Sequence, residues 1–170
     1  MQPETDAPMS LKPGGETFRD RVVHPLMFRA YMLAKMPVLG VTGAYLTDID
    51  TRRSEMVLPF GWSTKNLFGR MFDSAVVAAA ETTSLSLLVL HVRNQDVALR
   101  AELVEMTTEV HASPTSDLHI RCEDGHHYAD FVRRASEEAP LTRTFEVCAK
   151  TSDGRTCHEI AFQWRLRHRE

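Results

Sequence analysis

The chain has 170 residues, a length that fits one domain with a modest core. Its apolar fraction of 43% and its charged fraction of 25% are those of an ordinary soluble globular protein. Twenty basic residues are outnumbered by 23 acidic ones, and the resulting net charge of −3 excludes an electrostatic case for binding nucleic acid.

The sequence also argues against export and against a membrane location. The N-terminal residues are polar and lack the apolar region of a signal peptide. The most apolar stretch, residues 74–92, carries Glu81 and five Ser or Thr residues, which is too polar for a helix that faces lipid. Cys122, Cys148 and Cys157 are irregularly spaced and are best explained as reduced thiols. We therefore expect a cytoplasmic protein without a membrane partner.

The first part of the chain predicts a tail, a helix and two strands. Residues 1–20 are expected to be a flexible tail, and residues 21–170 a single domain. Apolar residues at helical spacing predict an amphipathic helix over residues 24–36, which Pro37 ends. The elements expected next are a strand at 38–50, a turn, a strand at 53–60 and a loop at 61–69.

The second part of the chain predicts a long helix over residues 71–91 and then four strands. In the strand expected over residues 97–110, the alternation of apolar residues slips at Val104, which predicts a β-bulge. The remaining elements are a strand at 118–123, a short helix or a long excursion at 125–138, and a hairpin of strands at 141–150 and 156–167. The last strand alternates clearly, with one apolar face formed by Ile160, Phe162, Trp164 and Leu166.

This order of elements predicts an α+β fold. A long apolar helix needs an enclosing sheet, and an antiparallel sheet can cover it on one face. We therefore expect a curved antiparallel sheet wrapped around a long central helix.

Glu81 is the most informative residue of the central helix. It is the only acid in residues 74–92, where no Lys or Arg occurs, and at helical spacing it shares a face with Val77, Ser84 and Leu88. A carboxylate in such surroundings loses solvation, so it must be paired, hydrogen-bonded or have a raised pKa. A raised pKa beside a cleft suits acid–base chemistry, whereas the structural alternative is a solvated or salt-bridged Glu at the end of a groove.

The run from Asn66 to Ser74, followed by Glu81, resembles the hotdog-fold acyl-CoA thioesterases. It is most similar to their phenylacetyl-CoA (PaaI-like) branch and to a related hotdog family of uncharacterised function. The usual pattern is Asn-x-x-Gly-x-x-His-Gly-Gly-x6-Asp/Glu, in which Asn66, Gly69 and Glu81 fall in register. The order of the predicted elements also matches over roughly residues 24–167.

The resemblance implies a function and a set of site residues. Glu81 would activate water or attack the thioester, and Asn66 would orient the water or the substrate. The remaining positions of the motif would contact the substrate: Gly69, Phe72, Ser74 and, one turn after Glu81, Ser84. The resemblance implies an acyl-CoA or acyl-carrier thioester as substrate and no cofactor or metal. It also implies a homodimer or homotetramer with each site between two subunits.

The chain departs from the family pattern at three positions. Phe72 stands where His is frequent, and Asp73 and Ser74 stand where the family has two Gly residues. In the family, the backbone N–H of the first Gly polarises the thioester carbonyl. Asp73 keeps that N–H, but its carboxylate could cap the helix and occupy the donors that a substrate oxygen needs. The alternative is that Asp73 is itself catalytic. For Asn66 the structural alternative is a turn residue.

Two other functions compete with hydrolysis. The first is a non-catalytic acyl-thioester binder that has lost the oxyanion geometry at Asp73. The second is a hotdog hydratase or dehydratase, which needs a His close to an acid, and the loop and helix offer none before His91. Signatures of serine hydrolases, of P-loops and of dinucleotide-binding proteins do not occur in the chain.

Overall fold

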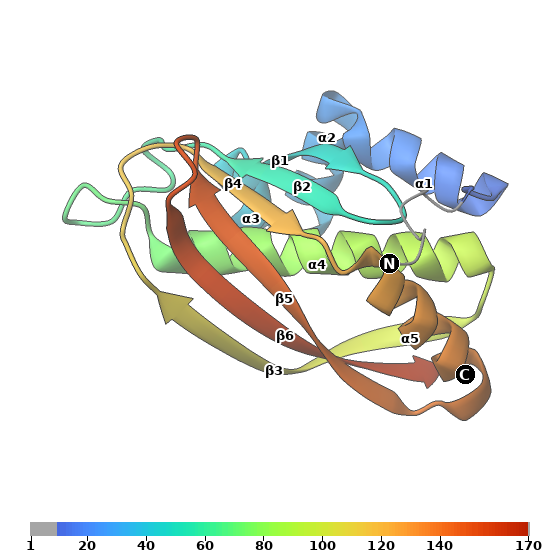
Figure 1. The fold of residues 1–170 in the computed structure, drawn as a ribbon. Coiled ribbons are helices and arrows are strands. Elements are labelled where there is room, and N and C mark those ends of the chain that lie inside the picture. The colour runs from blue at the N-terminus through green and yellow to red at the C-terminus, as the bar shows by residue number, and fades with distance from the viewer. Residues whose placement is uncertain (1–9, 170) are drawn as a thin grey trace, which may run out of the picture.

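The computed structural model describes residues 10–169, in which a six-stranded sheet wraps around one long helix (Figure 1). The helices are α1 (Pro13–Val23), α2 (Pro25–Lys35), α3 (Pro37–Thr42), α4 (Asp73–Gln95) and α5 (Gly125–Glu138). The strands are β1 (Tyr45–Ile49), β2 (Ser54–Leu58), β3 (Leu99–Val110), β4 (Leu118–Cys122), β5 (Leu141–Thr151) and β6 (Thr156–His168). The expected α+β architecture is confirmed.

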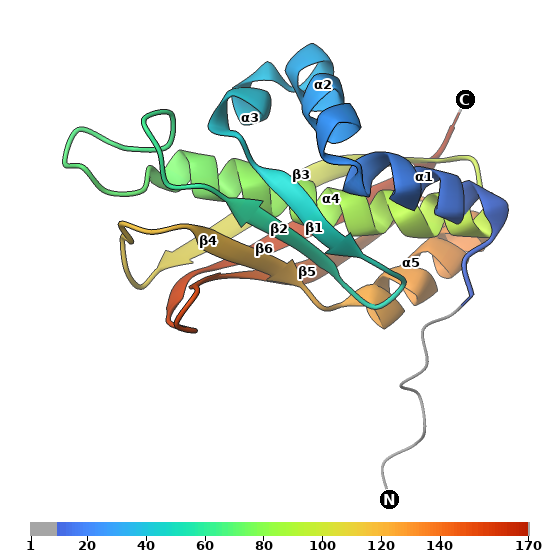
Figure 2. The same cartoon turned by 90° about the horizontal axis from the view of Figure 1, so that it is seen from above.

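All neighbouring strands of the sheet are antiparallel, in the order β1-β2-β4-β5-β6-β3. The register between β3 and β6 shifts between Leu103 and Glu105, which confirms the β-bulge that the sequence predicts at Val104. Figure 2 shows that the sheet curves around α4 instead of lying flat. Because β3 is the last strand in this order, its outer edge has no strand beside it among the described residues.

The core lies between α4 and the inner face of the sheet. Small residues such as Ala79 and Ala80 are fully buried, so the helix can approach the strands closely, and Leu87 and Leu88 fill the space beyond them. Each fully buried Leu stabilises the fold by roughly 1.5–3 kcal/mol. By length and composition α4 could also cross a membrane, but 67% of its most apolar window is buried inside the protein, as in the core helix of a soluble fold.

The N-terminal tail differs from the expectation over residues 13–20. These residues belong to α1, which packs along the far end of α4, while residues 1–9 lie outside the described residues. Gly14 and Gly15 allow this contact, because a Cβ atom at either position would come within 3 Å of Arg93 or Asn94. The Asn94 side chain also accepts a hydrogen bond from the Lys12 backbone N–H at 2.6 Å. The two Gly residues therefore serve close helix packing.

The strand expected over residues 38–50 also differs, because only its second half is a strand. Pro37 stands at the start of α3, where its fixed φ angle favours a helix and its missing N–H costs nothing. Gly43 ends α3 with a φ angle of 75°, a left-handed conformation that Gly adopts without strain. The chain then enters β1 at Tyr45. Pro37 therefore ends one helix and begins the next.

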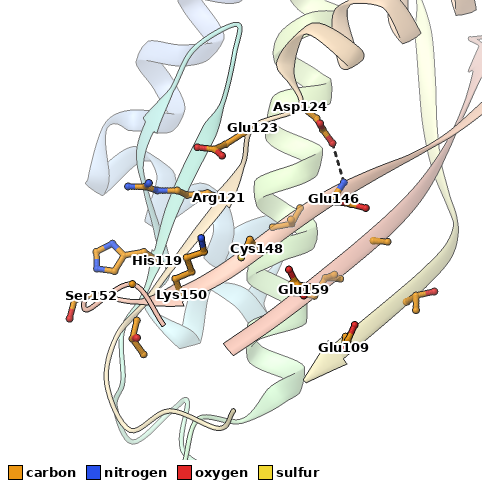
Figure 3. A pocket seen from close by; sticks show the side chains of 16 residues that line it. Glu109, His119, Arg121, Glu123, Asp124, Glu146, Cys148, Lys150, Ser152 and Glu159 are labelled. Atoms are coloured by element: carbon orange, nitrogen blue, oxygen red, sulfur yellow. Dashed lines mark hydrogen bonds between the residues drawn. The ribbon is translucent and has the colours of Figure 1, made fainter. Parts of the chain in front are cut away.

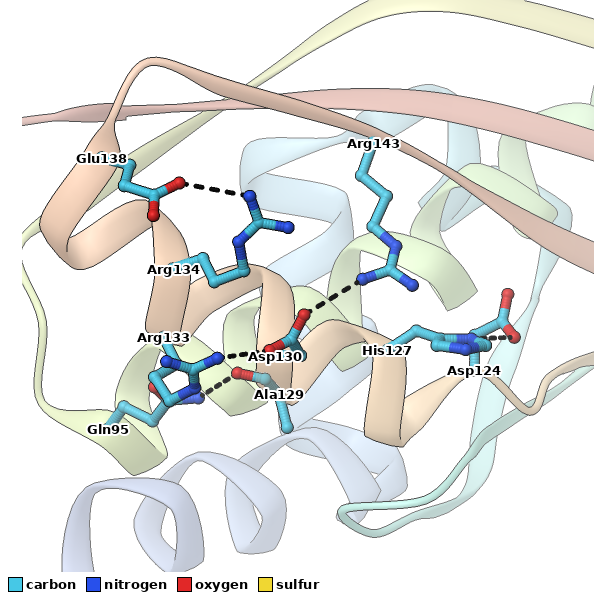
Figure 4. A network of polar contacts seen from close by, with 9 residues as sticks. All are labelled: Gln95, Asp124, His127, Ala129, Asp130, Arg133, Arg134, Glu138 and Arg143. Atoms are coloured by element: carbon cyan, nitrogen blue, oxygen red, sulfur yellow. Dashed lines mark hydrogen bonds and ion pairs between the residues drawn. The ribbon is translucent and has the colours of Figure 1, made fainter.

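Helix α5 settles the choice left open for residues 125–138. Its apolar face holds Tyr128, whose ring stacks on Phe145 of β5 with centroids 3.6 Å apart. Its polar face is joined to neighbouring elements, as Figure 4 shows. Gln95 of α4 donates a hydrogen bond to the Ala129 carbonyl at 2.9 Å, and Asp130 pairs with Arg143 of β5 at 3.5 Å. Because the Asp130–Arg143 pair is partly exposed, it contributes little, and α5 is attached mainly by its buried apolar face, which also holds Phe131, Val132 and Ala135.

Gly125, at the start of α5, is a position where the backbone leaves no room for a side chain. A Cβ atom there would lie 2.2 Å from the Thr51 carbonyl oxygen and 2.4 Å from the Arg52 Cα. We predict that Gly125→Ala lowers the free energy of unfolding by about 1–3 kcal/mol, measured by urea denaturation. Gly61→Ala is the control, because its Cβ would meet no atom within 4 Å, and it should change stability by less than about 1 kcal/mol. Equal effects of the two substitutions would contradict this packing.

Candidate active site

Asn66 organises the loop that leads into α4. Its side-chain oxygen accepts hydrogen bonds from the backbone N–H groups of Phe68 at 2.9 Å and Arg70 at 3.1 Å. The backbone N–H of Asn66 donates to the Arg70 carbonyl at 2.8 Å, and the backbone carbonyl of Asn66 accepts a hydrogen bond from the Gly69 N–H at 3.0 Å. Asn66 is therefore a turn residue in this structure. A role in orienting substrate would rest on its amide nitrogen, which has no hydrogen bond among the described residues.

Gly69 completes the same turn. Its φ angle is 72°, and residues with a Cβ rarely adopt this left-handed conformation. A Cβ there would meet no atom within 4 Å, so the backbone angle and not crowding requires Gly. The spacing from Asn66 to Gly69 thus encodes a turn, and this turn sets the path of the chain toward α4.

The loop is fixed to the start of α4 by backbone contacts. The Phe72 N–H donates to the carbonyl of buried Thr64 at 2.8 Å, and the Met71 N–H donates to the Pro114 carbonyl at 2.9 Å. The Thr64 hydroxyl in turn donates to the Pro59 carbonyl at 2.8 Å. The first turn of the helix is therefore held rigidly, although the Phe72 side chain itself is half exposed.

The start of α4 keeps unpaired backbone donors. Phe72 is the N-cap residue, and no side chain caps the helix. The N–H groups of Asp73 and Ser74 have no hydrogen-bond acceptor among the described residues, whereas that of Ala75 already bonds to the Phe72 carbonyl. Free N–H groups at the positive end of a helix are a suitable site for an oxyanion. The capping role considered for the Asp73 carboxylate is therefore not what the structure shows.

The Asp73 carboxylate bonds to His158 instead. The His158 Nε2 lies 2.9 Å from Asp73 Oδ1, and the side chain of His158 is fully buried while that of Asp73 is half exposed. No motif singles out His158, which lies 85 residues further along the chain. The alternation of β6 could have placed it, because His158 precedes Ile160 by two residues and shares its inner face.

This His–acid pair bears on the hydratase alternative. The sequence offered no His near an acid in the loop and helix, but β6 brings His158 to Asp73. A hydratase needs a His that exchanges a proton with the substrate, and the His158 ring is fully buried behind Asp73. The pair is therefore placed to orient the carboxylate and not to contact a substrate.

Glu81 lies on the part of α4 that the sheet leaves uncovered. It is half-buried, and burial raises the pKa of its carboxyl above the ordinary value of 4.5. It makes no hydrogen bond or ion pair with any described residue. Its neighbours on this stripe of partly exposed residues are Ser74, Val77, Ala78 and Leu85. The expected isolated acid in an apolar setting is thus present, and a general base would have these properties.

One chain does not bring Glu81 to the free N–H groups. Asp73 and Glu81 are eight residues apart, which at 1.5 Å per residue places them about 12 Å apart along the helix axis. Oxyanion donors must lie within about 3 Å of the carbonyl oxygen, and a base must lie within hydrogen-bond reach of the attacking water. Glu81 and the free N–H groups of one chain are therefore too far apart to act on the same carbonyl.

Ser84 has a different role from the substrate contact that we expected. Its hydroxyl accepts a hydrogen bond from Trp164 Nε1 at 2.8 Å and shares another with the Tyr128 hydroxyl at 2.6 Å. Ser84 is fully buried, so this network joins α4, α5 and β6 inside the core. This corrects the expected substrate-binding role of Ser84. Ser74, by contrast, is exposed at the start of the helix.

A groove on the surface of the sheet lies away from all of these residues. It measures about 910 Å³ and lies on the opposite face of the sheet from α4 (Figure 3). Basic side chains from β4 and β5 and acidic side chains from β3, β5 and β6 line it: His119, Arg121, Lys150, Glu109, Glu146 and Glu159. The groove contains neither Glu81 nor the start of α4, so we do not place the site here.

Among the described residues, one group of side chains could approach a metal ion. Glu109, His111 and Glu159 lie together on β3, β6 and the segment after β3, and all three are exposed. The His111 Nε2 already pairs with Glu159 at 2.7 Å. This contact already joins two of the three side chains, and we assign no metal to the cluster.

The raised pKa of Glu81 predicts how stability depends on pH. A carboxyl with a raised folded pKa contributes stability that is fully present below its unfolded pKa and is lost as pH rises through the folded pKa. Glu81→Gln removes this loss of stability, because the amide does not ionise. The variant should therefore gain unfolding free energy relative to wild type as the pH rises above the ordinary pKa of 4.5, measured by urea denaturation. Glu137→Gln, at an exposed position on α5, controls for the lost charge. A Glu81→Gln difference that does not change with pH would contradict the burial of this carboxylate.

No protein-family model and no curated protein match the sequence. Solved structures do match it. A Pseudomonas aeruginosa protein named as a probable thioesterase has a TM-score of 0.73 at 16% identity, covering 96% of this chain and 100% of its own. A Haemophilus influenzae thioesterase has a TM-score of 0.61 at 13% identity, covering 81% and 87%. A Chlorobaculum tepidum protein of unknown function has a TM-score of 0.72 at 12% identity, covering 87% and 99%. Together with the sheet curved around α4, these likenesses show that the chain has the hotdog fold.

Proposed function

We propose that the protein hydrolyses acyl thioesters at a site built from the start of α4 in one chain and Glu81 in a second. The observation that carries this proposal is the unpartnered, half-buried Glu81 on the same helix as two unpaired backbone donors. Hydrolysis of a thioester needs a base for water and donors for the developing oxyanion, and these are the two groups present. The thioesterase names of the structural neighbours support the same reaction class.

The reaction would proceed through one tetrahedral intermediate. The Glu81 carboxylate takes a proton from water as the water oxygen bonds to the carbonyl carbon. The carbonyl electron pair moves to oxygen, and the N–H groups of Asp73 and Ser74 donate hydrogen bonds to this oxyanion. When the intermediate collapses, the C–S bond breaks and the thiolate leaves, taking the proton that Glu81 carried. A free acid and a thiol are the products.

Exposed apolar surface supports the second chain. The free edge strand β3 exposes Leu103, Val104 and Met106, and an unpaired edge can add a strand from a second copy. The loop before α4 exposes further large apolar side chains: Trp62, Leu67, Phe68 and Phe72. Surface of this kind typically becomes buried at an interface. We therefore propose a homodimer, or a homotetramer built from such dimers.

The proposed substrate is an acyl-CoA or acyl-carrier thioester, in the cytoplasm, with no cofactor. Three free cysteines are in accord with a reducing compartment. A second candidate is a non-catalytic acyl-thioester binder, which the negative charge of Asp73 beside the free donors would favour. Thiol release over a panel of acyl-CoA esters, measured beside binding of the same panel, separates the two, because a binder shows affinity without release.

If Glu81 is the base, Glu81→Gln should keep the fold and lower kcat for acyl-CoA hydrolysis on the order of 10²-fold or more. The amide has nearly the same size but cannot take a proton from water. Thiol release measures kcat, and a melting curve confirms folding. Glu137→Gln, on the exposed side of α5, is again the matched control and should leave kcat unchanged. Activity of Glu81→Gln within a few-fold of wild type would refute the catalytic assignment.

The shared site predicts a stable oligomer. Light scattering at micromolar concentration should give at least a dimer. Met106→Asp, on the inner face of β3, should weaken association about tenfold or more and lower activity in parallel, because it places a charge in the proposed contact. Thr107→Asp carries the same charge on the opposite face and is its control. A stable, fully active monomer would exclude both the assembly and the shared site.

A further inference from the structure

We propose that His158 is a positioning residue that holds the Asp73 carboxylate away from the start of α4, which keeps the backbone N–H groups of Asp73 and Ser74 free for a substrate oxygen. The inference rests on the proposed function, because it explains how those groups can serve as oxyanion donors in a chain that carries an acid beside them.

The Asp73 carboxylate and a substrate oxygen would compete for the same backbone N–H groups. The start of a helix carries roughly half a positive charge, and a carboxylate in the first turn is attracted to it. Asp73 is the first residue of α4, so its carboxylate lies within reach of the same donors that a substrate oxygen would use. A carboxylate bonded there would occupy the donors and repel the developing oxyanion. The Gly that is usual at this position in the family has no carboxylate and leaves the donors free. In this chain the Asp73 carboxylate must be held elsewhere.

The structure shows where the carboxylate goes. Asp73 Oδ1 bonds to His158 Nε2 at 2.9 Å, and no side chain caps the helix. The N–H groups of Asp73 and Ser74 are therefore unpaired while the Asp73 carboxylate is bonded to His158. The carboxylate is therefore bonded to β6 and not to the backbone N–H groups at the start of α4.

His158 is suited to this role because it cannot move aside. Its ring lies on the inner face of β6, in the same row as Ile160 and Phe162, and its side chain is fully buried. The buried Nδ1 has no hydrogen-bond partner among the described residues. Since a buried N–H without an acceptor costs free energy, the tautomer with its proton on Nε2 is favoured. That tautomer donates to Asp73 and leaves Nδ1 as a bare acceptor.

The test is a double-mutant cycle on thiol release from a short acyl-CoA. His158→Leu, which keeps the apolar bulk but cannot donate, should lower kcat about tenfold or more while KM changes less than about threefold. His158→Gln can still donate to Asp73 and should recover kcat to within about threefold of wild type. In an Asp73→Gly background, His158→Leu should change kcat by less than about twofold, because no carboxylate remains to be held.

Amide hydrogen exchange gives a readout that does not depend on turnover. The Ser74 N–H should exchange rapidly in wild type and become protected in His158→Leu, as the released carboxylate caps the helix. Protection of Ser74 in wild type would overturn the proposal even if His158→Leu did not fold. An equal loss of kcat with and without Asp73, or a His158→Gln variant as impaired as His158→Leu, would also overturn it. Absence of thiol release in wild type, with the exchange pattern as expected, would instead refute the proposed hydrolysis and leave the role of His158 intact.

Discussion

Burial of α4 by the curved sheet is the constraint on which the rest of the structure depends. The helix is apolar over most of its circumference, and its small residues Ala79 and Ala80 allow β-strands to approach on one side. The sheet covers this side only, because a curved sheet of six strands does not close around a helix. One stripe of α4 therefore remains partly open, and the chemistry proposed for the protein lies along this stripe and at the start of the helix.

The position of Glu81 on the open stripe explains its properties. A carboxylate on the covered side would need a buried partner, and one on a fully solvated surface would have an ordinary pKa. Glu81 lies between these cases, since it is half-buried with a raised pKa and without a partner among the described residues. A helix alone cannot bring this acid to its own N-terminus. Association of two chains through β3 and the loop before α4 would cover exposed apolar side chains and complete the site in one step.

Local patterns of the sequence predicted most of the fold. The alternation of apolar residues located the long strands, the phase slip at Val104 located the bulge, and the run of Ala, Val and Leu located the buried central helix. The face of Glu81 was predicted less well, because Ser84 and Leu88, which were expected beside it, are fully buried. The errors came from residues that are compatible with two different local structures. Pro37 can end one helix and begin another, and Gly14 and Gly15 suit both a mobile tail and close helix packing. Contacts that are distant in sequence decided between these readings, and no local pattern records them.

The site was less predictable than the fold, because it depends on pairs that the chain brings together only when folded. Asn66 and Gly69 were found from their spacing, although the structure uses them to build a turn. His158 stands 85 residues from Asp73 and was visible only as a polar residue in an apolar row of β6. A buried polar side chain at the end of such a row must have a partner or cost free energy. An acid that departs from a family pattern, such as Asp73, should therefore be read together with the polar residues on the inner faces of the strands beneath it.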